Sequence, residues 1–352
     1  MRNGNVIFDL VVHVHNLLDV NHATGPGRLS QEFKYDYIRM YKKGVEEMPS
    51  REVFHTIPPD PQGVVDKIFG PGSEIDFAMA QVVPLFELFV EDPDVNIARV
   101  HEMTTLAPEG RLVFCGGTDP ALRGLNRALR DIEHQITELG AVSIKLYNAH
   151  ALGASWRMDD RTLAYPMYER MLELDCNLVQ VHKGDPQGLE PMEALRPGDV
   201  HQAALDFPEM NFIIHHLAFP YEDEAIDLAS RLPNVYLAMS TWINMIRIAP
   251  VETAMRMGKM LTWCRPEKVL WGSETPLWPS AQKLLDDAWD FQIPADLRRG
   301  WGFPEITDAD RAMMFGGNLM RLLGKSAPTV PTASTVPSSP STSESVGHAS
   351  RS

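Results

Sequence analysis

The sequence has few cysteines and no long hydrophobic run. Its three cysteines, Cys115, Cys176 and Cys264, lie far apart and form no Cys-x-x-Cys pair, which argues against a disulfide framework and against a cysteine-rich zinc site. No apolar run reaches the roughly 18 residues of a membrane-spanning helix, and two histidines stand in the N-terminal segment where a signal peptide would need apolar residues. We therefore expect a cytoplasmic protein.

Positive charge is also scarce. The 352 residues include 32 lysines and arginines against 47 aspartates and glutamates, which gives a formal net charge of −15. Such a surface repels phosphate backbones and anionic lipid headgroups, so we expect neither nucleic acid nor membrane as a partner. With 44% hydrophobic and 22% charged residues, the composition is that of a packed globular protein, which leaves a small molecule as the expected partner.

Short apolar runs alternate with amphipathic segments along most of the chain. The runs read as strands cover residues 5–15, 75–83, 111–115, 142–147, 177–182, 211–216, 234–240 and 268–273. The segments read as helices cover residues 120–139, 161–174, 222–232, 253–264 and 308–323. Most of the strand runs are continuously apolar, as expected of parallel strands covered on both faces. The pattern predicts an α/β protein with a (β/α)₈ TIM barrel. A doubly wound sheet is the alternative, weakened because no Gly-x-Gly-x-x-Gly follows the first run.

Two segments depart from this alternation. Residues 16–73 form a long insertion after the first strand, expected to be helical over 29–48 and a loop over 55–72. An insertion at the carboxyl end of a barrel strand overhangs the active site, so we interpret it as a lid or a subunit contact. From residue 325 the chain is rich in Ser, Thr and Pro, which predicts a disordered tail over 325–352 after a barrel domain over 1–324.

Residues that bind metals stand at the ends of several predicted strands. The first strand ends in His13-Val14-His15, and residues two apart in a strand point the same way. His182 ends the fifth strand, His215 and His216 end the sixth, Glu274 follows the eighth, and Lys145 lies in the fourth. Because strand ends converge at the mouth of a barrel, we expect these side chains to meet in one divalent-metal site.

The same residues carry a family resemblance. Residues 6–323 resemble the amidohydrolase superfamily, and most closely its amidohydrolase-2 branch, which is typified by aminocarboxymuconate-semialdehyde decarboxylase. The likeness rests on HVH at 13–15, Lys145, VHKG at 181–184, IIHHLAFP at 213–220, GSETP at 272–276 and the closing TDADRAMMFGGNLMRLLG segment, which carries Asn318.

The resemblance implies roles for these residues. His13, His15 and His182 would bind the metal, and His216 would be a catalytic group or a ligand of a second metal. Lys145 stands where dinuclear members carry a carboxylated lysine that bridges two metals. His216 matches the family pattern better than His215, which we expect to point the other way. Glu274 stands where the family has a metal-binding aspartate, so hydrolysis through an aspartate base is in doubt, but the carboxylate is kept.

These features favour a metal-dependent lyase or hydrolase that acts on a small carboxylated compound. The expected metal is Zn²⁺, with Mn²⁺ or Fe²⁺ as alternatives. Glu274 and His216 would move protons, and Arg157 would hold the substrate carboxylate, unless it forms a loop ion pair with Asp159 or Asp160.

Two other interpretations stay open. One is a subunit of a dinuclear iron or iron–manganese oxygenase that hydroxylates a small amino acid, as some members of this branch resemble. The other is a structural metal-binding partner subunit of such a complex, which only the departure at Glu274 favours. The resemblance also suggests a homo-oligomer, or a hetero-oligomer with a homologous subunit.

Overall fold

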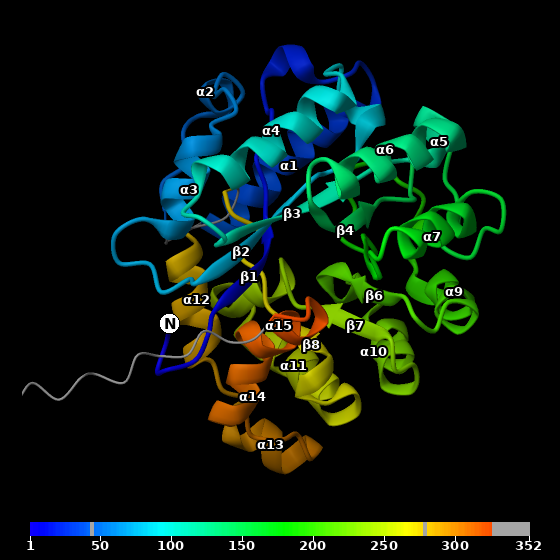
Figure 1. Cartoon of the computed structure of the whole chain (residues 1–352). Coiled ribbons are helices and arrows are strands. Elements are labelled where there is room, and N and C mark those ends of the chain that lie inside the picture. The colour runs from blue at the N-terminus through cyan, green and yellow to red at the C-terminus, as the bar shows by residue number, and fades with distance from the viewer. Residues whose placement is uncertain (43–45, 277–279, 326–352) are drawn as a thin grey trace, which may run out of the picture.

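A barrel of eight parallel strands forms the centre of the molecule. The computed structural model describes residues 1–42, 46–276 and 280–325. Figure 1 shows the strands in the middle and the helices packed around them. The strands, paired in sequence order, are β1 (Phe8–Val12), β2 (Phe77–Gln81), β3 (Leu112–Gly117), β4 (Ala141–Leu146), β5 (Leu178–Val181), β6 (Asn211–Ile214), β7 (Val235–Ala238) and β8 (Val269–Leu270). The predicted TIM barrel is confirmed.

The barrel closes where the chain beyond β8 meets β1. The backbone N–H of Leu10 donates to the Trp271 carbonyl at 3.1 Å, and that of Glu274 donates to the Val11 carbonyl at 3.0 Å. Val12 and Thr275 form a parallel bridge at the same seam. These bonds fix the backbone that carries Glu274 directly against the strand that precedes the two N-terminal histidines.

Helices form in the five segments predicted to be helical and in several others, between the strands and after β8. They are α4 (Pro93–Leu106), α5 (Pro120–Arg123), α6 (Leu125–Thr137), α7 (Ala164–Glu173), α8 (Met192–Leu195), α9 (Val200–Asp206), α10 (Glu222–Arg231), α11 (Pro250–Cys264), α12 (Ala281–Asp290), α13 (Ala295–Trp301), α14 (Asp308–Ala312) and α15 (Asn318–Leu322). Among the described residues, no helix combines the length and the apolar character that crossing a membrane requires.

Two of the predicted helices are not uniform. The helix expected over 120–139 is two helices, because Gly124 between α5 and α6 has a φ of +78°, which breaks helical geometry. The closing helix over 308–323 contains a π-helical segment, Met313–Gly317, between α14 and α15. There the Asn318 side chain donates to the carbonyls of Pro266 and Val269, both at 2.8 Å, and so attaches α15 to β8.

The insertion after β1 is more helical than predicted. It contains α1 (Pro26–Lys42), α2 (Arg51–Phe54) and α3 (Pro61–Phe69). The prediction of a loop over 55–72 was wrong for α3, which begins with Pro61 in its first turn and is capped by the Asp60 side chain, which accepts from Gly63 N–H. The tail predicted to be disordered lies outside the described residues, apart from Lys325.

Candidate metal centre

The candidate ligands lie just beyond the carboxyl ends of their strands. His13 and His15 follow β1, His182 follows β5, His215 and His216 follow β6, and Glu274 follows β8. Because all eight strands run parallel, these ends meet at one mouth of the barrel. The strands are shorter than predicted, so the candidate ligands are on the loops at that mouth.

Hydrogen bonds to backbone carbonyls orient two of the imidazoles. His13 Nδ1 lies 3.0 Å from the Gln81 carbonyl oxygen, and His182 Nε2 lies 3.0 Å from that of Asp185. A carbonyl oxygen only accepts, so these ring nitrogens carry the hydrogens. The lone pairs of His13 Nε2 and His182 Nδ1 are left to face the pocket, which is how metal-binding histidines are usually oriented.

The free ring nitrogens meet the carboxylate and one another. His13 Nε2 lies 3.2 Å from Glu274 Oε2, and His182 Nδ1 lies 3.1 Å from His216 Nε2. Glu274 Oε1 lies 3.5 Å from His216 Nδ1, and the rings of His13 and His15 have centroids 5.1 Å apart. The structure thus brings His13, His15, His182, His216 and Glu274 together.

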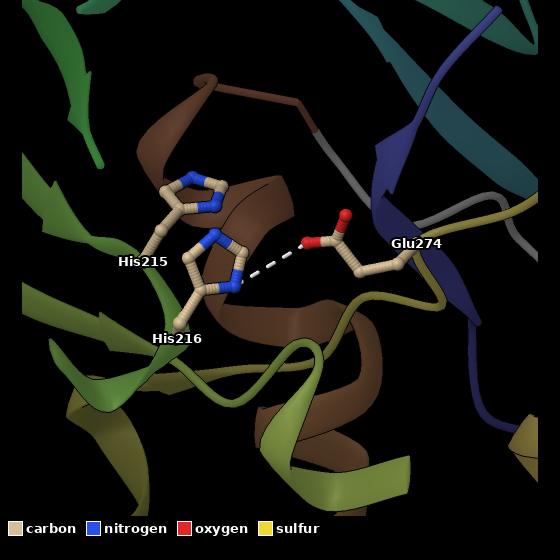
Figure 2. A group of neighbouring side chains, drawn as sticks. All are labelled: His215, His216 and Glu274. Carbon is tan, nitrogen blue, oxygen red and sulfur yellow. Dashed lines mark ion pairs between the residues drawn. The ribbon is translucent and has the colours of Figure 1, made fainter. Parts of the chain in front are cut away.

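His215 also faces this group, contrary to the expectation that it points the other way. Its Nε2 lies 2.7 Å from the Gln180 side-chain oxygen inside the barrel. His215, His216 and Glu274 form a buried cluster whose potential ligand atoms all lie within 4.8 Å of one another, and Figure 2 shows the two rings on one side with the carboxylate opposite. Strand alternation already directs His215 inward, and a left-handed backbone turns the next residue inward as well.

Left-handed backbone recurs around the mouth. His216, Thr241 and Glu274 have φ values of +57°, +62° and +62°. Non-glycine residues adopt this region at a cost, and such residues cluster at functional sites where the surrounding structure holds them. The Thr241 hydroxyl lies 3.0 Å from His216 Nδ1, so one such residue positions another.

Burial keeps the imidazoles neutral. It holds the pKa values of His15, His182, His215 and His216 well below the usual 6.5, and the nearby Lys145 ammonium and neighbouring histidines lower most of them further. A neutral imidazole is the form that binds a metal ion.

Lys145 lies deeper in the barrel, in β4 beside Gln180 of β5. Its side chain is buried, and its Nζ lies 5.6 Å from the centre of the Tyr147 ring. Burial lowers the pKa of Lys145 to about 7, against the opposing effect of the Glu274 charge. An amine with this pKa is partly neutral near pH 7, the form that carboxylation requires.

Arg157 does not reach this group. Its side chain is 64% exposed, and its guanidinium binds the Asp159 carboxylate through two hydrogen bonds of 2.7 and 2.9 Å. The loop ion pair, which was the alternative interpretation, is what forms. The prediction that Arg157 holds the substrate carboxylate is therefore not supported.

Several pocket residues were missed in the sequence. The pocket is lined by His13, His15, Val83, Tyr147, His182, His216, Thr241 and Glu274 from the barrel, and by Lys34, Tyr37, Ile38, Asp185 and Gln187 from α1 and the loop after β5. Tyr147 stacks on His182 with ring centroids 4.2 Å apart. Asp185 accepts a 2.8 Å hydrogen bond from the Tyr37 hydroxyl, and burial raises its pKa to about 7. The one indication of Asp185 in the sequence was its position three residues after His182.

A family match agrees with this geometry. The Amidohydrolase family model (Amidohydro_2) matches residues 78–325, which is most of the chain. The chain belongs to the amidohydrolase family. The matched residues include His182, His216 and Glu274, whereas His13 and His15 lie before them. No curated protein matches the sequence.

Solved structures share the fold of this amidohydrolase at low identity. An uncharacterized TIM-barrel protein from Bordetella bronchiseptica is 18% identical, with a TM-score of 0.61, over 90% of this chain and 98% of that chain. A 5-carboxyvanillate decarboxylase from Sphingomonas paucimobilis is 14% identical, with a TM-score of 0.58, over 92% and 100%. An amidohydrolase from Burkholderia multivorans with bound zinc is 14% identical, with a TM-score of 0.55, over 91% and 100%. At these identities the likeness concerns the fold alone.

The residues at the mouth fit a divalent cation. Two ligands of one tetrahedral zinc, each about 2.0–2.1 Å from the ion, lie roughly 3.3 Å apart. The separation of 3.2 Å between His13 Nε2 and Glu274 Oε2 is close to that value. His15 Nε2 and Glu274 Oε1 are buried and have no hydrogen-bond partner among the described residues. Buried polar atoms normally have partners, and a bound ion would supply one here.

Proposed function

We propose that this amidohydrolase is a metal-dependent lyase or hydrolase that decarboxylates or hydrolyses a small carboxylated compound. One observation carries the proposal. Imidazoles from three strand ends and the Glu274 carboxylate converge in a buried pocket, with their ring nitrogens and carboxylate oxygens close to one another. The decarboxylase and amidohydrolase structures that share the fold are consistent with both reactions.

The ligand set that we propose is His13, His15, His182 and Glu274, with His216 beside it. Zn²⁺ is the first choice because neutral imidazoles and a carboxylate suit it, and Mn²⁺ or Fe²⁺ would accept the same donors. When bound, the cation supplies a Lewis acid that polarises a substrate oxygen.

The chain's own groups would bind the substrate and move the proton. His216 Nδ1 and Glu274 Oε1 lie 3.5 Å apart without a hydrogen bond between them, so either group could exchange a proton with a substrate atom in the pocket. The Asp185 carboxylate has a pKa of about 7, which is suited to exchanging protons near neutral pH, and its Oδ2 lies 3.9 Å from His216 Nδ1. Helix α1 covers the pocket and would limit access of water.

The test is a metal count by elemental mass spectrometry on the purified full chain. We expect about one zinc per chain in the wild type and a loss of most of it in a His13→Ala, His15→Ala double variant. His134→Ala is the matched control because His134 is an exposed helix residue paired with Glu138, and it should keep the metal. A wild-type protein without metal from several growth media would refute the proposal.

Activity then separates the alternatives. A lyase or hydrolase should convert carboxylated compounds under nitrogen, release carbon dioxide or a hydrolysis product, and lose activity when a chelator removes the metal. Two metals per chain that include iron or manganese, with activity that requires O₂, would favour the oxygenase subunit instead. A chain that binds metal but shows no catalytic activity until a homologous chain is added would favour the partner-subunit interpretation. The cytoplasmic location and the oligomeric state stay predictions.

A further inference from the structure

Lys34 is a buried lysine of the insertion whose side chain lines the metal pocket. It lies in the middle of α1, its side chain is part of the pocket wall with His13, His15 and Glu274, and the residue is only 6% exposed.

The Lys34 ammonium has no hydrogen-bond or ion-pair partner in the part of the chain that the structure describes. No hydrogen bond or ion pair of its Nζ is formed with residues 1–42, 46–276 or 280–325. The Phe89 ring centre lies 5.2 Å from Nζ. Asp185 and Glu190 act on the Lys34 charge through space, but neither carboxylate comes within the 4.0 Å of an ion pair.

A buried ammonium without hydrogen-bond partners is costly. It has three N–H donors, and withdrawing a charged group from water is unfavourable unless those donors are used. Burial accordingly lowers the pKa of Lys34 to about 8, against the opposing charges of Glu190 and Asp185. A ligand anion that enters the pocket would meet a desolvated donor, and hydrogen bonds between ionised groups are strongest in such surroundings.

The backbone of α1 is held in place around this lysine. Ser30 Oγ donates to the Gln187 carbonyl, and the Tyr37 hydroxyl donates to Asp185 at 2.8 Å, so both anchors are on the loop after β5. At the start of the helix, a Cβ on Gly27 would lie 2.4 Å from the Leu88 carbonyl oxygen, which shows how closely the two backbones approach. Lys34 is therefore carried on a fixed element, which favours a binding role over that of a freely moving surface charge.

We propose that Lys34 binds a carboxylate of the substrate that does not react, while the reacting group lies at the metal centre. This inference rests on the proposed function, because it assigns the reacting group to the metal. It narrows the substrate class. A decarboxylation substrate would carry two acidic groups, one lost as carbon dioxide and one retained at Lys34. A hydrolysis substrate would pair one carboxylate with an amide or ester.

Binding of two simple probes tests the proposal. The affinities of the full metal-loaded chain for glutarate, a dicarboxylate, and for butyrate, its monocarboxylate counterpart, are measured by calorimetry. A charge-assisted hydrogen bond corresponds to about a 10- to 100-fold difference in affinity, so the wild type should bind glutarate more tightly than butyrate by about that factor. Lys34→Met and Lys34→Gln should abolish the difference and leave butyrate binding unchanged, and Lys34→Arg should keep part of it.

Lys42→Met is the matched control. Lys42 ends the same helix, is partly buried and pairs with Glu46 at 3.3 Å, so its removal should leave glutarate binding unchanged. Thermal unfolding separates binding from a structural role. Because removing an unpaired buried charge is not destabilising, the melting temperature of Lys34→Met should equal or exceed that of the wild type. Unchanged glutarate binding in Lys34→Met, or a loss of equal size in Lys42→Met, would overturn the proposal.

The metal count keeps this result separate from the proposed function. If the wild type carries no metal, the proposed function fails, and the same titration on the metal-free chain still tests Lys34. If the metal-free wild type prefers glutarate and Lys34→Met does not, the anion site at Lys34 is supported and only the metal-dependent reaction is refuted. Equal binding of glutarate and butyrate by a wild type that does carry zinc would refute the Lys34 site alone.

Discussion

Replacing His150 with glutamine should change how the stability of the protein depends on pH. His150 follows β4 at the barrel mouth, and its side chain is fully buried. Its Nε2 lies 2.6 Å from Asp119 Oδ2, and its Nδ1 lies 3.6 Å from Glu87 Oε1. Burial alone would lower the pKa of His150, but the nearby Asp119 and Glu87 carboxylates outweigh it and raise the pKa to about 9.

The size of the effect follows from that pKa. The rise from 6.5 to about 9 is roughly 2.5 units, and at 1.36 kcal/mol per unit it corresponds to about 3 kcal/mol as an upper value. The folded protein binds this proton more tightly than the unfolded chain does. The stabilisation is therefore fully present below pH 6.5, decreases as the pH rises, and is lost above about pH 9.

Urea unfolding of the full chain at several pH values between about 6 and 9.5 measures this contribution, with chelator present so that metal binding does not add its own pH dependence. The difference in unfolding free energy between the wild type and His150→Gln should fall by about 2–3 kcal/mol across this range. His134→Gln, at an exposed site, should follow the wild-type profile. A difference that stays constant within about 0.5 kcal/mol would show that His150 is neutral in the folded protein, and the reasoning would fail.

Two further substitutions test the geometry of the site. Arg157→Ala should change kcat/KM by less than about twofold, because the side chain is exposed and paired with Asp159. A loss above about tenfold would place it on the substrate after all. Gly184→Ala should lower the unfolding free energy by more than about 2 kcal/mol in urea, because Gly184 has a φ of +63° and an added Cβ would lie 2.2 Å from the Ala218 carbonyl carbon. An effect below about 0.5 kcal/mol would show that the loop after His182 yields easily.

The fold could be predicted because its main signal is local. Apolar runs, most of them continuous, marked the eight strands, and the alternation with helices left few arrangements open. The errors also have local causes. The segment over 55–72 was expected to be a loop for its prolines and glycines, although Asp60 and Pro61 are residues that begin a helix. In the segment over 120–139, the left-handed Gly124 ends one helix and begins the next.

The site could be predicted only where topology decides it. Histidines at the ends of parallel strands must meet, so the convergence of His13 and His182 could be predicted without any loop conformation, whereas His216 was favoured over His215 only by the family resemblance. Lys34 and Tyr37 enter the pocket from an insertion whose path no strand pattern describes. Asp185 enters because the chain turns sharply after His182, with left-handed backbone at Gly184 and Asp185. The side-chain orientations that such turns set depend on contacts between residues distant in sequence, and these contacts cannot be inferred from a single sequence.

The position of Glu274 tests the interpretation that the chain is a catalytically inactive partner subunit. That interpretation depended on Glu274 as a departure from the family's aspartate. The backbone of Glu274 is bonded to Val11 of β1, and the longer side chain brings one oxygen to 3.2 Å from His13 and the other to 3.5 Å from His216. An aspartate on the same backbone would withdraw the carboxylate by about 1.5 Å, the length of one carbon–carbon bond. Glutamate therefore contacts histidines from both sides of the mouth here, and its presence no longer argues for a site that has lost its function.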